Sequence, residues 1–457
     1  MPLPSIATED TIAAIATARG QAAVAIIRVS GDAALEVAYA IFQNKQSMTK
    51  TLKPGRFYTG WIHDENNTPI DHVLVLVFAS PKSYTGEDVI EIHCHGGDVL
   101  AQKILARCIA VGCRYAEPGE YTLRAFLNGK MDLTQAESVM DLISSGSSRL
   151  LRQASDNIQN RSLGTYLDTM AHGLMALQAQ MVASIDFPDE VEEPKREVIA
   201  VQLENCLTQM GHLRENAEKS RIVREGIKVA ILGMPNSGKS SLFNALLATE
   251  RSIVTQEAGT TRDVVSEVLD IDGIAVTLID TAGIRETQES IEIMGIERSW
   301  KAASEAHIVL YLVDASVGVL RYDTQILSKL DPGSTIAVGN KKDLMLDHQK
   351  KYGGWVYLSV KTQEGIPDLL NALKSKIQTL SPEESGVILA LNERQIACCI
   401  AMEEKLQEAK EALDSELPLD LVTLPLTQSL KKLDELQGRD TTEDVLGEVF
   451  ARFCVGK

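Results

Sequence analysis

At its centre the chain reads Gly233-Met234-Pro235-Asn236-Ser237-Gly238-Lys239-Ser240-Ser241, a glycine-rich turn with the pattern G-x-x-x-x-G-K-S. A short apolar run precedes it at 227–232, and apolar residues recur at helical spacing after it. The segment therefore predicts a buried strand, a turn and a helix, which is the setting of a phosphate-binding loop. Backbone N–H groups and the positive end of the helix would face a polyphosphate, Lys239 would reach its β and γ oxygens, and the Ser240 hydroxyl would hold Mg²⁺. A chance glycine-rich turn is the alternative, and the flanking elements argue against it.

Two further motifs follow predicted strands and specify the nucleotide. A hairpin predicted at 264–280, with its turn at Asp272-Gly273, leads into Asp280-Thr281-Ala282-Gly283, where an aspartate can order the Mg²⁺ shell and a glycine N–H can sense the γ-phosphate. After a later predicted strand comes Asn340-Lys341-Lys342-Asp343, whose carboxylate can accept two guanine N–H groups that adenine does not offer together. With Ser359-Val360-Lys361 in the loop that would close over the base, the motifs predict GTP.

The residues themselves leave open how this GTP would be hydrolysed. Ile284 follows Gly283, at the position where Ras-like enzymes use a glutamine to orient water. Because isoleucine cannot hydrogen-bond, another polar side chain must do so, and the acidic segment that follows offers Glu286, Glu289 and Glu292, unless it is only a solvated charge run. In the phosphate-binding loop, the amide oxygen of Asn236 could coordinate a monovalent cation near the phosphates, or the residue could belong to a turn-forming Pro-Asn pair.

Composition is that of a globular protein and limits the partners. Its 457 residues suggest roughly three domains, and 44% hydrophobic with 24% charged residues is ordinary for a folded chain. No apolar run approaches the roughly 20 residues that a membrane span needs, and the N-terminus lacks a signal pattern. Seven scattered cysteines do not suggest a disulfide framework, so we expect a cytoplasmic protein with no membrane partner. A net charge of −18 argues against binding nucleic acid over most of the surface, so any RNA must meet a local patch or another subunit.

The pattern of the sequence changes near residue 132. Before it, apolar runs of strand length alternate with helical segments, at 24–29, 33–42, 73–78, 89–95 and 99–111. After it, nearly everything to about residue 225 reads as helix, and Thr134 and Glu137 have capping-box spacing ahead of a helix at 136–143. Apolar residues at helical spacing predict bundle core at Leu163, Leu167, Met170, Leu174, Leu177 and Met181.

Helical patterning returns after the nucleotide-binding segment. One helix is expected to end at Ser381-Pro382, and residues 392–415 and 427–453 each read as a long helix. Helical stretches on both sides of an α/β unit suggest one bundle into which that unit is inserted.

In the strand predicted at 89–95, Glu91, His93 and His95 fall on one face because side chains alternate along a strand. Three ligands on one straight strand diverge, and no second ligand cluster lies nearby in the sequence. We therefore expect a strand that ends in a Gly-Gly turn beside a small-molecule pocket, rather than a metal site.

Segments outside the GTPase motifs carry a resemblance to a known family. They are Ile26-Ile27-Arg28-Val29-Ser30-Gly31, Tyr84-Thr85-Gly86-Glu87-Asp88-Val89, Pro118-Gly119-Glu120-Tyr121-Thr122, Arg124-Ala125-Phe126-Leu127-Asn128-Gly129-Lys130, Ile185-Asp186-Phe187-Pro188 and the terminal Phe453-Cys454-Val455-Gly456-Lys457. With them, the chain resembles the MnmE (TrmE) family of tRNA-modifying GTPases along essentially its whole length, whereas the GTPase motifs alone would also fit ribosome-assembly GTPases. The chain departs from the family pattern before Arg28, where most glycines of the lead-in are missing, and at His93 and Cys94.

The resemblance implies a multidomain protein with α/β and all-helical parts. An α+β N-terminal domain at 1–131 would bind tetrahydrofolate and form a homodimer, a helical domain would combine 132–223 and 381–457, and a Ras-like α/β P-loop G domain at 224–380 would be inserted into it. With an FAD-dependent subunit of the GidA/MnmG family, in an expected heterotetramer, the protein would install a (carboxymethyl)aminomethyl group at C5 of the tRNA wobble uridine. The one-carbon unit would come from 5-formyl- or 5,10-methylene-tetrahydrofolate. GTP hydrolysis, activated by K⁺-dependent association of two G domains, would drive the conformational cycle rather than the carbon chemistry.

At individual positions the resemblance implies specific roles. Glu292 would polarise the attacking water. Mg²⁺ would be held by Ser240 and Thr261, and K⁺ by Asn236, Thr255, Thr260 and the carbonyl of Glu257. Folate would contact Arg28, Glu91, Lys130 and Lys457, since a buried carboxylate can pair with the edge of a pterin and the folate's glutamate tail requires cations. The expected GTP-binding residues are Asn236, Ser237, Gly238, Lys239, Ser240, Ser241, Thr255, Thr260, Thr261, Asp280, Gly283, Asn340, Lys341, Asp343, Ser359, Val360 and Lys361.

Two alternatives stay open. Cys454 superficially resembles a prenylation site, but lysine is a poor final residue; it could lie in an inert tail, whereas the resemblance places it beside the folate pocket, where it could take part in catalysis. For the whole protein, the alternative function is a GTP-gated ribosome or assembly switch without modification chemistry, which would need no folate pocket.

Overall fold

The computed structural model describes residues 10–43, 52–249, 265–280, 303–346, 351–380 and 391–457, with backbone alone at 216–220, 249, 265, 266 and 280. The chain separates into two compact units. The first combines Met1–Met140, Asn157–Gln178 and Thr427–Lys457, and the second combines Asp141–Asp156 and Ala179–Leu426. Within the described part of the chain, no helix is both long enough and apolar enough to cross a membrane.

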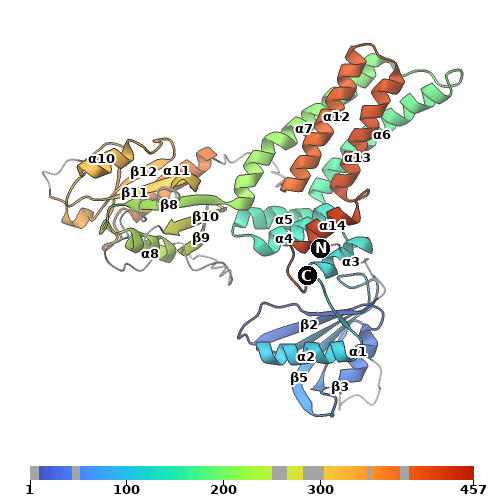
Figure 1. Cartoon of the computed structure of the whole chain (residues 1–457), viewed down its shortest axis with the longest axis horizontal. Helices are drawn as coiled ribbons and strands as arrows, with labels where there is room; N and C mark the ends of the chain where they lie inside the picture. The colour runs from blue at the N-terminus through green and yellow to red at the C-terminus, as the bar shows by residue number, and fades with distance from the viewer. Residues whose placement is uncertain (1–9, 44–51, 250–264, 281–302, 347–350, 381–390) are drawn as a thin grey trace. The chain divides into compact units, whose positions relative to one another are not determined.

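The first unit contains a seven-stranded sheet in the order β3-β4-β5-β6-β2-β1-β7 (Figure 1). Neighbouring strands pair antiparallel except β1 and β7, which pair parallel. The strands are β1 (Ile12–Ile15), β2 (Val24–Ser30), β3 (Phe42–Gln43), β4 (Arg56–His63), β5 (Pro69–Phe78), β6 (Val89–His95) and β7 (Arg114–Tyr115).

One face of this sheet is buried beneath two helices. The helices α1 (Ala34–Ile41) and α2 (Asp98–Ala110) bring Ile41 and Ile104 against Ile27 and Ile92 of the sheet. Because strand side chains alternate, the residues next to these core positions point to the other face. That face carries Arg28 and Glu91, two of the candidate folate-binding residues.

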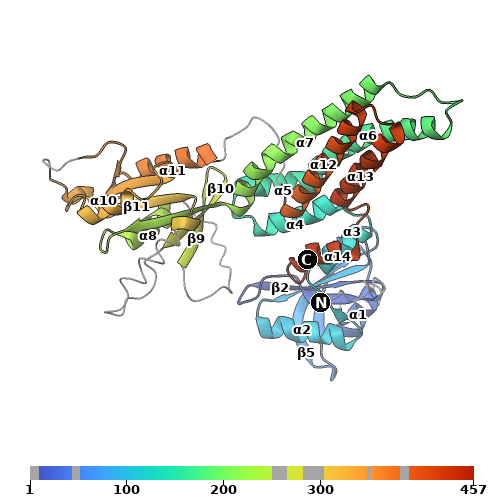
Figure 2. The same ribbon diagram turned by 45° about the horizontal axis from the view of Figure 1, so that its top comes forward.

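The C-terminal segment belongs to the same unit. Helices α3 (Glu120–Leu127) and α14 (Glu443–Ala451) lie close to the last residues of the chain in both views (Figures 1 and 2). Phe450 and Phe453 pack with Leu133 in a small apolar core, so the end of the chain is anchored and not frayed.

The helical parts contain long helices, as the sequence predicted. In the second unit, α7 (Arg196–Glu225) and α12 (Glu393–Asp414) run side by side (Figures 1 and 2). The other helices are α4 (Leu133–Ser144), α5 (Ser148–Asn160), α6 (Ser162–Asp186) and α13 (Leu419–Gln437). The predicted apolar stripe on α6 is buried at all six positions, from Leu163 to Met181.

Two predictions in these helices were wrong. The helix expected at 136–143 begins at Leu133, and its capping residue is Asp132, whose carboxylate accepts from the Gln135 N–H at 2.8 Å while the Gln135 side chain accepts from the Asp132 N–H at 3.0 Å. The single helix expected at 427–453 is two helices, α13 and α14, because Gly438 adopts a left-handed φ of 80° that ends the first one.

The second unit also contains the six-stranded sheet of the nucleotide-binding part, in the order β13-β12-β11-β8-β10-β9. All neighbours pair parallel except the hairpin β9–β10, whose turn is Asp272-Gly273 with φ of 51° and 80°. The strands are β8 (Ile227–Gly233), β9 (Val265–Ile271), β10 (Ile274–Asp280), β11 (Ile308–Asp314), β12 (Thr335–Asn340) and β13 (Val356–Tyr357).

Helices cover both faces of this sheet. Leu242 of α8 (Lys239–Thr249) and Leu373 of α11 (Ile366–Leu380) pack with Val229 on one face, and Ile326 of α10 (Arg321–Leu327) packs with Tyr311 on the other. An α+β part, helical parts and a Ras-like P-loop sheet confirm the predicted fold class.

Candidate functional site

The phosphate-binding loop joins β8 to α8, and its backbone requires glycine at two positions. Gly233 has a φ of 149°, and a Cβ there would lie 2.2 Å from the carbonyl oxygen of Leu312 on the adjacent strand. Gly238 has a φ of 100°, and a Cβ there would lie 2.3 Å from Nδ2, the side-chain amide nitrogen of Asn340. Glycine is therefore required at Gly233 by the backbone of the neighbouring strand, and at Gly238 by its left-handed conformation and the side chain of Asn340. Asn236, exposed in the same loop, is also left-handed, with a φ of 65°.

Lys239 is the first residue of α8, and its ammonium group folds back over the loop. It donates to the carbonyl oxygens of Gly233 at 3.0 Å and Met234 at 3.1 Å. The side chain thus adds a full positive charge to the positive end of the helix. Inside the loop, the buried Ser237 hydroxyl has no hydrogen-bond partner among the described residues. A positive helix end, an ammonium group and the exposed hydroxyl-bearing residues Ser240 and Ser241 suit a polyphosphate with Mg²⁺.

Asn340, the first residue of the predicted base-recognition motif, connects three loops. Its buried amide nitrogen donates to the carbonyl oxygen of Ser237 at 2.8 Å, and its amide oxygen accepts from the Val360 N–H at 3.2 Å. The phosphate-binding loop and the loop expected to close over the base are therefore fixed to one side chain. Ser359, at the start of the latter loop, is fully buried.

The rest of this motif presents charged groups. Lys341 is left-handed with a φ of 60°, and its ammonium lies 2.6 Å from the carboxylate of Asp314 at the end of β11. Burial tends to raise the pKa of Asp314, but hydrogen bonds from Lys341 and Ser316 outweigh it and hold that pKa below the usual aspartate value. Asp343 and Lys361 are exposed, so the Asp343 carboxylate is accessible to a purine.

Several predicted site residues lie outside the described residues. Asp280 ends β10, and only its backbone is described. Thr255, Glu257, Thr260, Thr261, Gly283 and Glu292 lie wholly outside the described part of the chain, as do Ile284, Glu286 and Glu289. Their roles stay predictions.

The open face of the N-terminal sheet holds a second cluster. Arg28 of β2 stands directly opposite Glu91 of β6, and its guanidinium contacts one carboxylate oxygen, Oε1, through Nε at 3.0 Å and Nη2 at 2.9 Å. The two side chains are only 14% and 17% exposed. The rings of Tyr84 and Tyr121 lie 5.3 Å and 5.6 Å from the same guanidinium. Arg28 is therefore held by a carboxylate and two aromatic faces.

The C-terminal tail completes this cluster. The guanidinium of Arg28 donates to the carbonyl oxygen of Gly456 at 3.4 Å, across 428 positions of sequence. Gly456 has a φ of 97°, and a Cβ there would lie 2.5 Å from the carbonyl oxygen of Ile15, so the tail can dock only with glycine. Burial and the nearby Arg28 lower the pKa of Lys457, against the opposing effect of Glu91. Cys454 is exposed in the same tail.

The predicted folate-binding residues are thus brought together in part. Arg28, Glu91 and Lys457 converge, whereas Lys130 is exposed and donates to the carbonyl oxygen of Pro81 at 2.7 Å. A carboxylate, two cations and an aromatic ring are groups that fit the polar edge, the tail carboxylates and the ring of a tetrahydrofolate. The sequence did not assign Tyr84 and Tyr121 to the site, although both lie in the segments that carry the family resemblance.

The two histidines of β6 contact different carboxylates. His95 is bonded through Nδ1 to Asp71 at 2.8 Å, whereas Nε2 of His93 lies 3.5 Å from Oε2 of Glu91. Among the described residues, no group of three or more His, Cys, Asp or Glu side chains is arranged to hold a metal ion.

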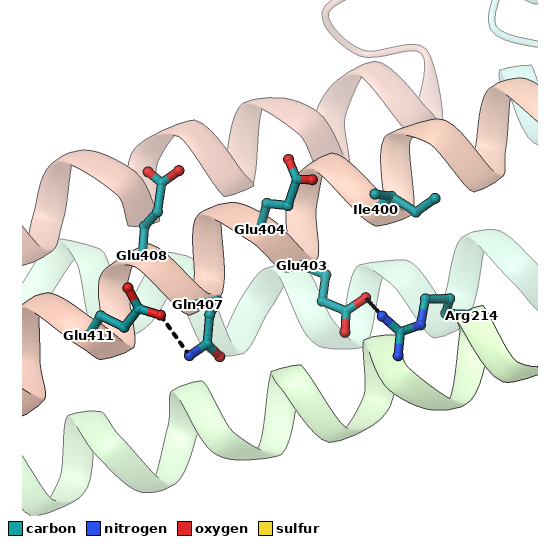
Figure 3. A pocket seen from close by; sticks show the side chains of 7 residues that line it. All are labelled: Arg214, Ile400, Glu403, Glu404, Gln407, Glu408 and Glu411. Atoms are coloured by element: carbon teal, nitrogen blue, oxygen red, sulfur yellow. Dashed lines mark hydrogen bonds and ion pairs between the residues drawn. The ribbon is translucent and has the colours of Figure 1, made fainter.

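A groove on the helical part has a different character (Figure 3). It lies between α7 and α12 and has a volume of about 450 Å³. Arg214 pairs with Glu403 at 3.3 Å, and the amide of Gln407 donates to Glu411 at 3.1 Å. The lining residues are Arg214, Ile400, Glu403, Glu404, Gln407, Glu408 and Glu411. Four carboxylates with one guanidinium oppose the approach of phosphates, so neither a nucleotide nor an RNA backbone fits this groove.

Two family models match the chain, one over the N-terminal part and one over the rest. The family model described as "GTP-binding protein TrmE N-terminus" matches residues 11–130, and the model described as "MnmE helical domain" matches residues 133–454. Among solved structures, the G domain of the T. maritima FeoB iron transporter is 25% identical, covers 34% of this chain and 98% of its own, and has a TM-score of 0.25.

Full-length relatives extend the match. The tRNA modification GTPase MnmE of Synechococcus elongatus is 39% identical over 459 residues, covering 98% of this chain and 99% of the relative. The protein of the same name from Fervidobacterium nodosum is 37% identical over 451 residues, with 98% of each chain covered. With a family model that matches most of the chain and relatives that align from end to end, the chain belongs to the MnmE family of tRNA modification GTPases.

Proposed function

We propose that this GTPase acts in the modification of tRNA, installing a (carboxymethyl)aminomethyl group at C5 of the wobble uridine together with an FAD-dependent subunit of the GidA/MnmG type. One observation carries the proposal. Residues 456–457 return to Arg28 and Glu91 and build a second cationic site in the first unit, whereas the phosphate-binding loop belongs to the second. A protein that only switches with GTP has no need of such a site.

At the nucleotide site, GTP hydrolysis requires charge neutralisation and an oriented water. In the proposed complex, Lys239 exchanges its contacts with Gly233 and Met234 for the β and γ oxygens. Asp343 selects guanine, and Glu292 polarises the water that attacks the γ-phosphorus as the bond to the β–γ bridging oxygen breaks. Mg²⁺ would be held by Ser240 and Thr261, and K⁺ by Asn236, Thr255, Thr260 and the carbonyl of Glu257; both ions would supply positive charge to the phosphates.

At the N-terminal site, Arg28, Glu91, Lys130 and Lys457 would hold a 5-formyl- or 5,10-methylene-tetrahydrofolate, which supplies a one-carbon unit. Glu91 pairs with the pterin edge, and the cations take the glutamate tail. The anchored tail keeps Cys454 in the same unit as this site, and we propose that its thiol takes part in the modification chemistry. The proposed domains are 1–131, 132–223 with 381–457, and 224–380, with a homodimer formed by the first of them.

Isothermal titration of the full-length chain with 5-formyl-tetrahydrofolate tests this proposal. The wild-type chain should bind the folate, and Glu91→Gln, which keeps the shape but removes the charge, should weaken binding by about a hundredfold because a buried Arg28 loses its partner. Exposed Glu117→Gln in the same unit is the matched control and should bind as the wild type does. A chain that binds GTP but no folate would favour the GTP-gated ribosome or assembly switch.

A further inference from the structure

His93 is the next residue after Glu91 on the open face of strand β6. In the register of the sheet, Ile26 of β2 and Leu74 of β5 stand directly opposite it on either side. Both apolar neighbours are half-buried, as is His93, whose side chain is 25% exposed. The imidazole therefore lies in a partly apolar stretch of the same sheet face that carries the folate-binding carboxylate.

The ring nitrogen Nε2 of His93 is buried and makes no hydrogen bond to any described residue. It lies 3.5 Å from Oε2 of Glu91, while Arg28 is bonded to the other oxygen, Oε1, at 2.9 Å and 3.0 Å. A carboxylate can only accept hydrogen bonds, so the tautomer with hydrogen on Nε2 is favoured beside it. The site thus places an acceptor, Glu91 Oε2, next to an unused donor, His93 Nε2–H.

This pair complements one edge of the ring system of a folate. The lactam edge of a pterin carries an N3–H donor next to a C4 oxo acceptor. We propose, on the basis of the folate site proposed above, that His93 is a specificity-determining residue: Glu91 Oε2 accepts from N3–H while His93 Nε2–H donates to the C4 oxygen. A 4-amino pteridine presents the reverse order, an acceptor at N3 next to a donor at C4. Its N3 acceptor would face the acceptor Glu91 Oε2, and its 4-amino donor would face the donor His93 Nε2–H. Both pairs of buried polar atoms would then lack a hydrogen bond.

The test compares two ligands on three forms of the full-length chain. Isothermal titration measures the affinity of 5-formyl-tetrahydrofolate and of its 4-amino analogue, at an alkaline pH where the diaminopteridine ring is neutral. The forms are the wild type, His93→Leu, which removes the donor, and His93→Gln, which keeps an N–H donor on a side chain of similar length. Circular dichroism and thermal unfolding confirm that each variant is folded.

In the wild type, the 5-formyl folate should bind about tenfold or more tightly than the 4-amino analogue. His93→Leu should weaken the 5-formyl folate about tenfold and bring the two affinities close together, whereas His93→Gln should keep most of the preference. A role limited to positioning Glu91 would change both affinities equally, so an unchanged preference in His93→Leu contradicts the assignment. The assignment is also contradicted if folded His93→Gln loses the preference for the 5-formyl folate as fully as His93→Leu does. A wild-type chain that binds neither ligand refutes the folate site itself, and the inference with it.

Discussion

The two sites of this protein are built in opposite ways. The nucleotide site is made mostly of backbone: glycines that touch neighbouring strands, a helix end, and one lysine that lies over the loop carbonyls. The N-terminal site is made of side chains: an arginine and a glutamate on neighbouring strands, two tyrosine rings, and the last residues of the chain.

This difference indicates how each site should tolerate amino-acid substitutions. A backbone site recognises phosphates through N–H groups that nearly every residue supplies, so we expect the glycines and Lys239 to be the loop positions that tolerate substitution least. A side-chain site depends on each group and on distant segments that bring the groups together, so it can change specificity one residue at a time. The predictions that follow test this contrast.

The largest effect is expected from Lys239→Ala. Removing the ammonium group that contacts the loop carbonyls of Gly233 and Met234 should slow GTP hydrolysis by about a hundred- to a thousandfold, because the transferred phosphate loses the positive charge that Lys239 supplies. The rate of phosphate release from GTP, followed with radiolabelled GTP or with malachite green, measures this effect. Lys351→Ala, at an exposed position of the same unit, should leave turnover unchanged. Near-normal turnover in Lys239→Ala would refute the nucleotide site.

The second effect concerns the cation. If the backbone site needs an ion where other GTPases insert an arginine, hydrolysis should be at least about tenfold faster in K⁺ than in Na⁺. Asn236→Ala should abolish the difference by removing an amide ligand. The steady-state rates of both forms in the two salts measure it, and equal rates for the wild type would assign Asn236 to the turn alone.

The third effect concerns the docked tail. Gly456→Ala should weaken 5-formyl-tetrahydrofolate binding by about tenfold, because the added Cβ meets the carbonyl oxygen of Ile15 at 2.5 Å and displaces Lys457. Val455→Ala changes an exposed neighbour and serves as the control. Titration calorimetry measures both, and equal affinities would show that the tail is not part of the folate site.

The smallest effect is a dependence on pH in the nucleotide-binding part. The lowered pKa of Asp314 means that its ionised form stabilises the fold above the usual aspartate value, and that this stability is lost as the pH falls through the lowered value. Asp314→Asn should therefore cost about 1–2 kcal/mol at neutral pH, and the difference from the wild type should shrink below roughly pH 4. Hydrogen exchange of the β11 and β12 amides measures it. A difference that stays constant down to acid pH would contradict the assignment.

Prediction from sequence succeeded where the causes are local. The strands, the hairpin turn at Asp272-Gly273 and the phosphate-binding loop are encoded within a few residues of where they form. Helix limits were less well predicted. Gly438 does not interrupt the apolar spacing that suggested one long helix, and only its left-handed backbone shows the break. The cap at Asp132 was overlooked because Thr134 and Glu137 have the same spacing.

The connections between distant segments could not be predicted from pattern alone. Asn340 was expected only to be one of the GTP-binding residues, and nothing in its motif indicates that its side-chain amide donates to the carbonyl oxygen of Ser237, 103 positions earlier. In the N-terminal site, the family resemblance placed Arg28, Glu91 and Lys457 together, whereas the carbonyl of Gly456 as a partner of Arg28 appears only in the structure. Alternation along β6 did place His93 on the same face as Glu91, but that its Nε2 has no hydrogen-bond partner among the described residues appears only in the structure.

Mass spectrometry of wobble nucleosides most directly tests whether both sites serve one reaction. Transfer RNA would be taken from cells in which the wild-type chain, Lys239→Ala or Glu91→Gln replaces the native protein. We predict that both variants accumulate wobble uridine lacking the C5 group, since one lacks GTP hydrolysis and the other lacks the folate. Full modification in Glu91→Gln, with stable protein and a loss in Lys239→Ala alone, would contradict the claim that the N-terminal site takes part.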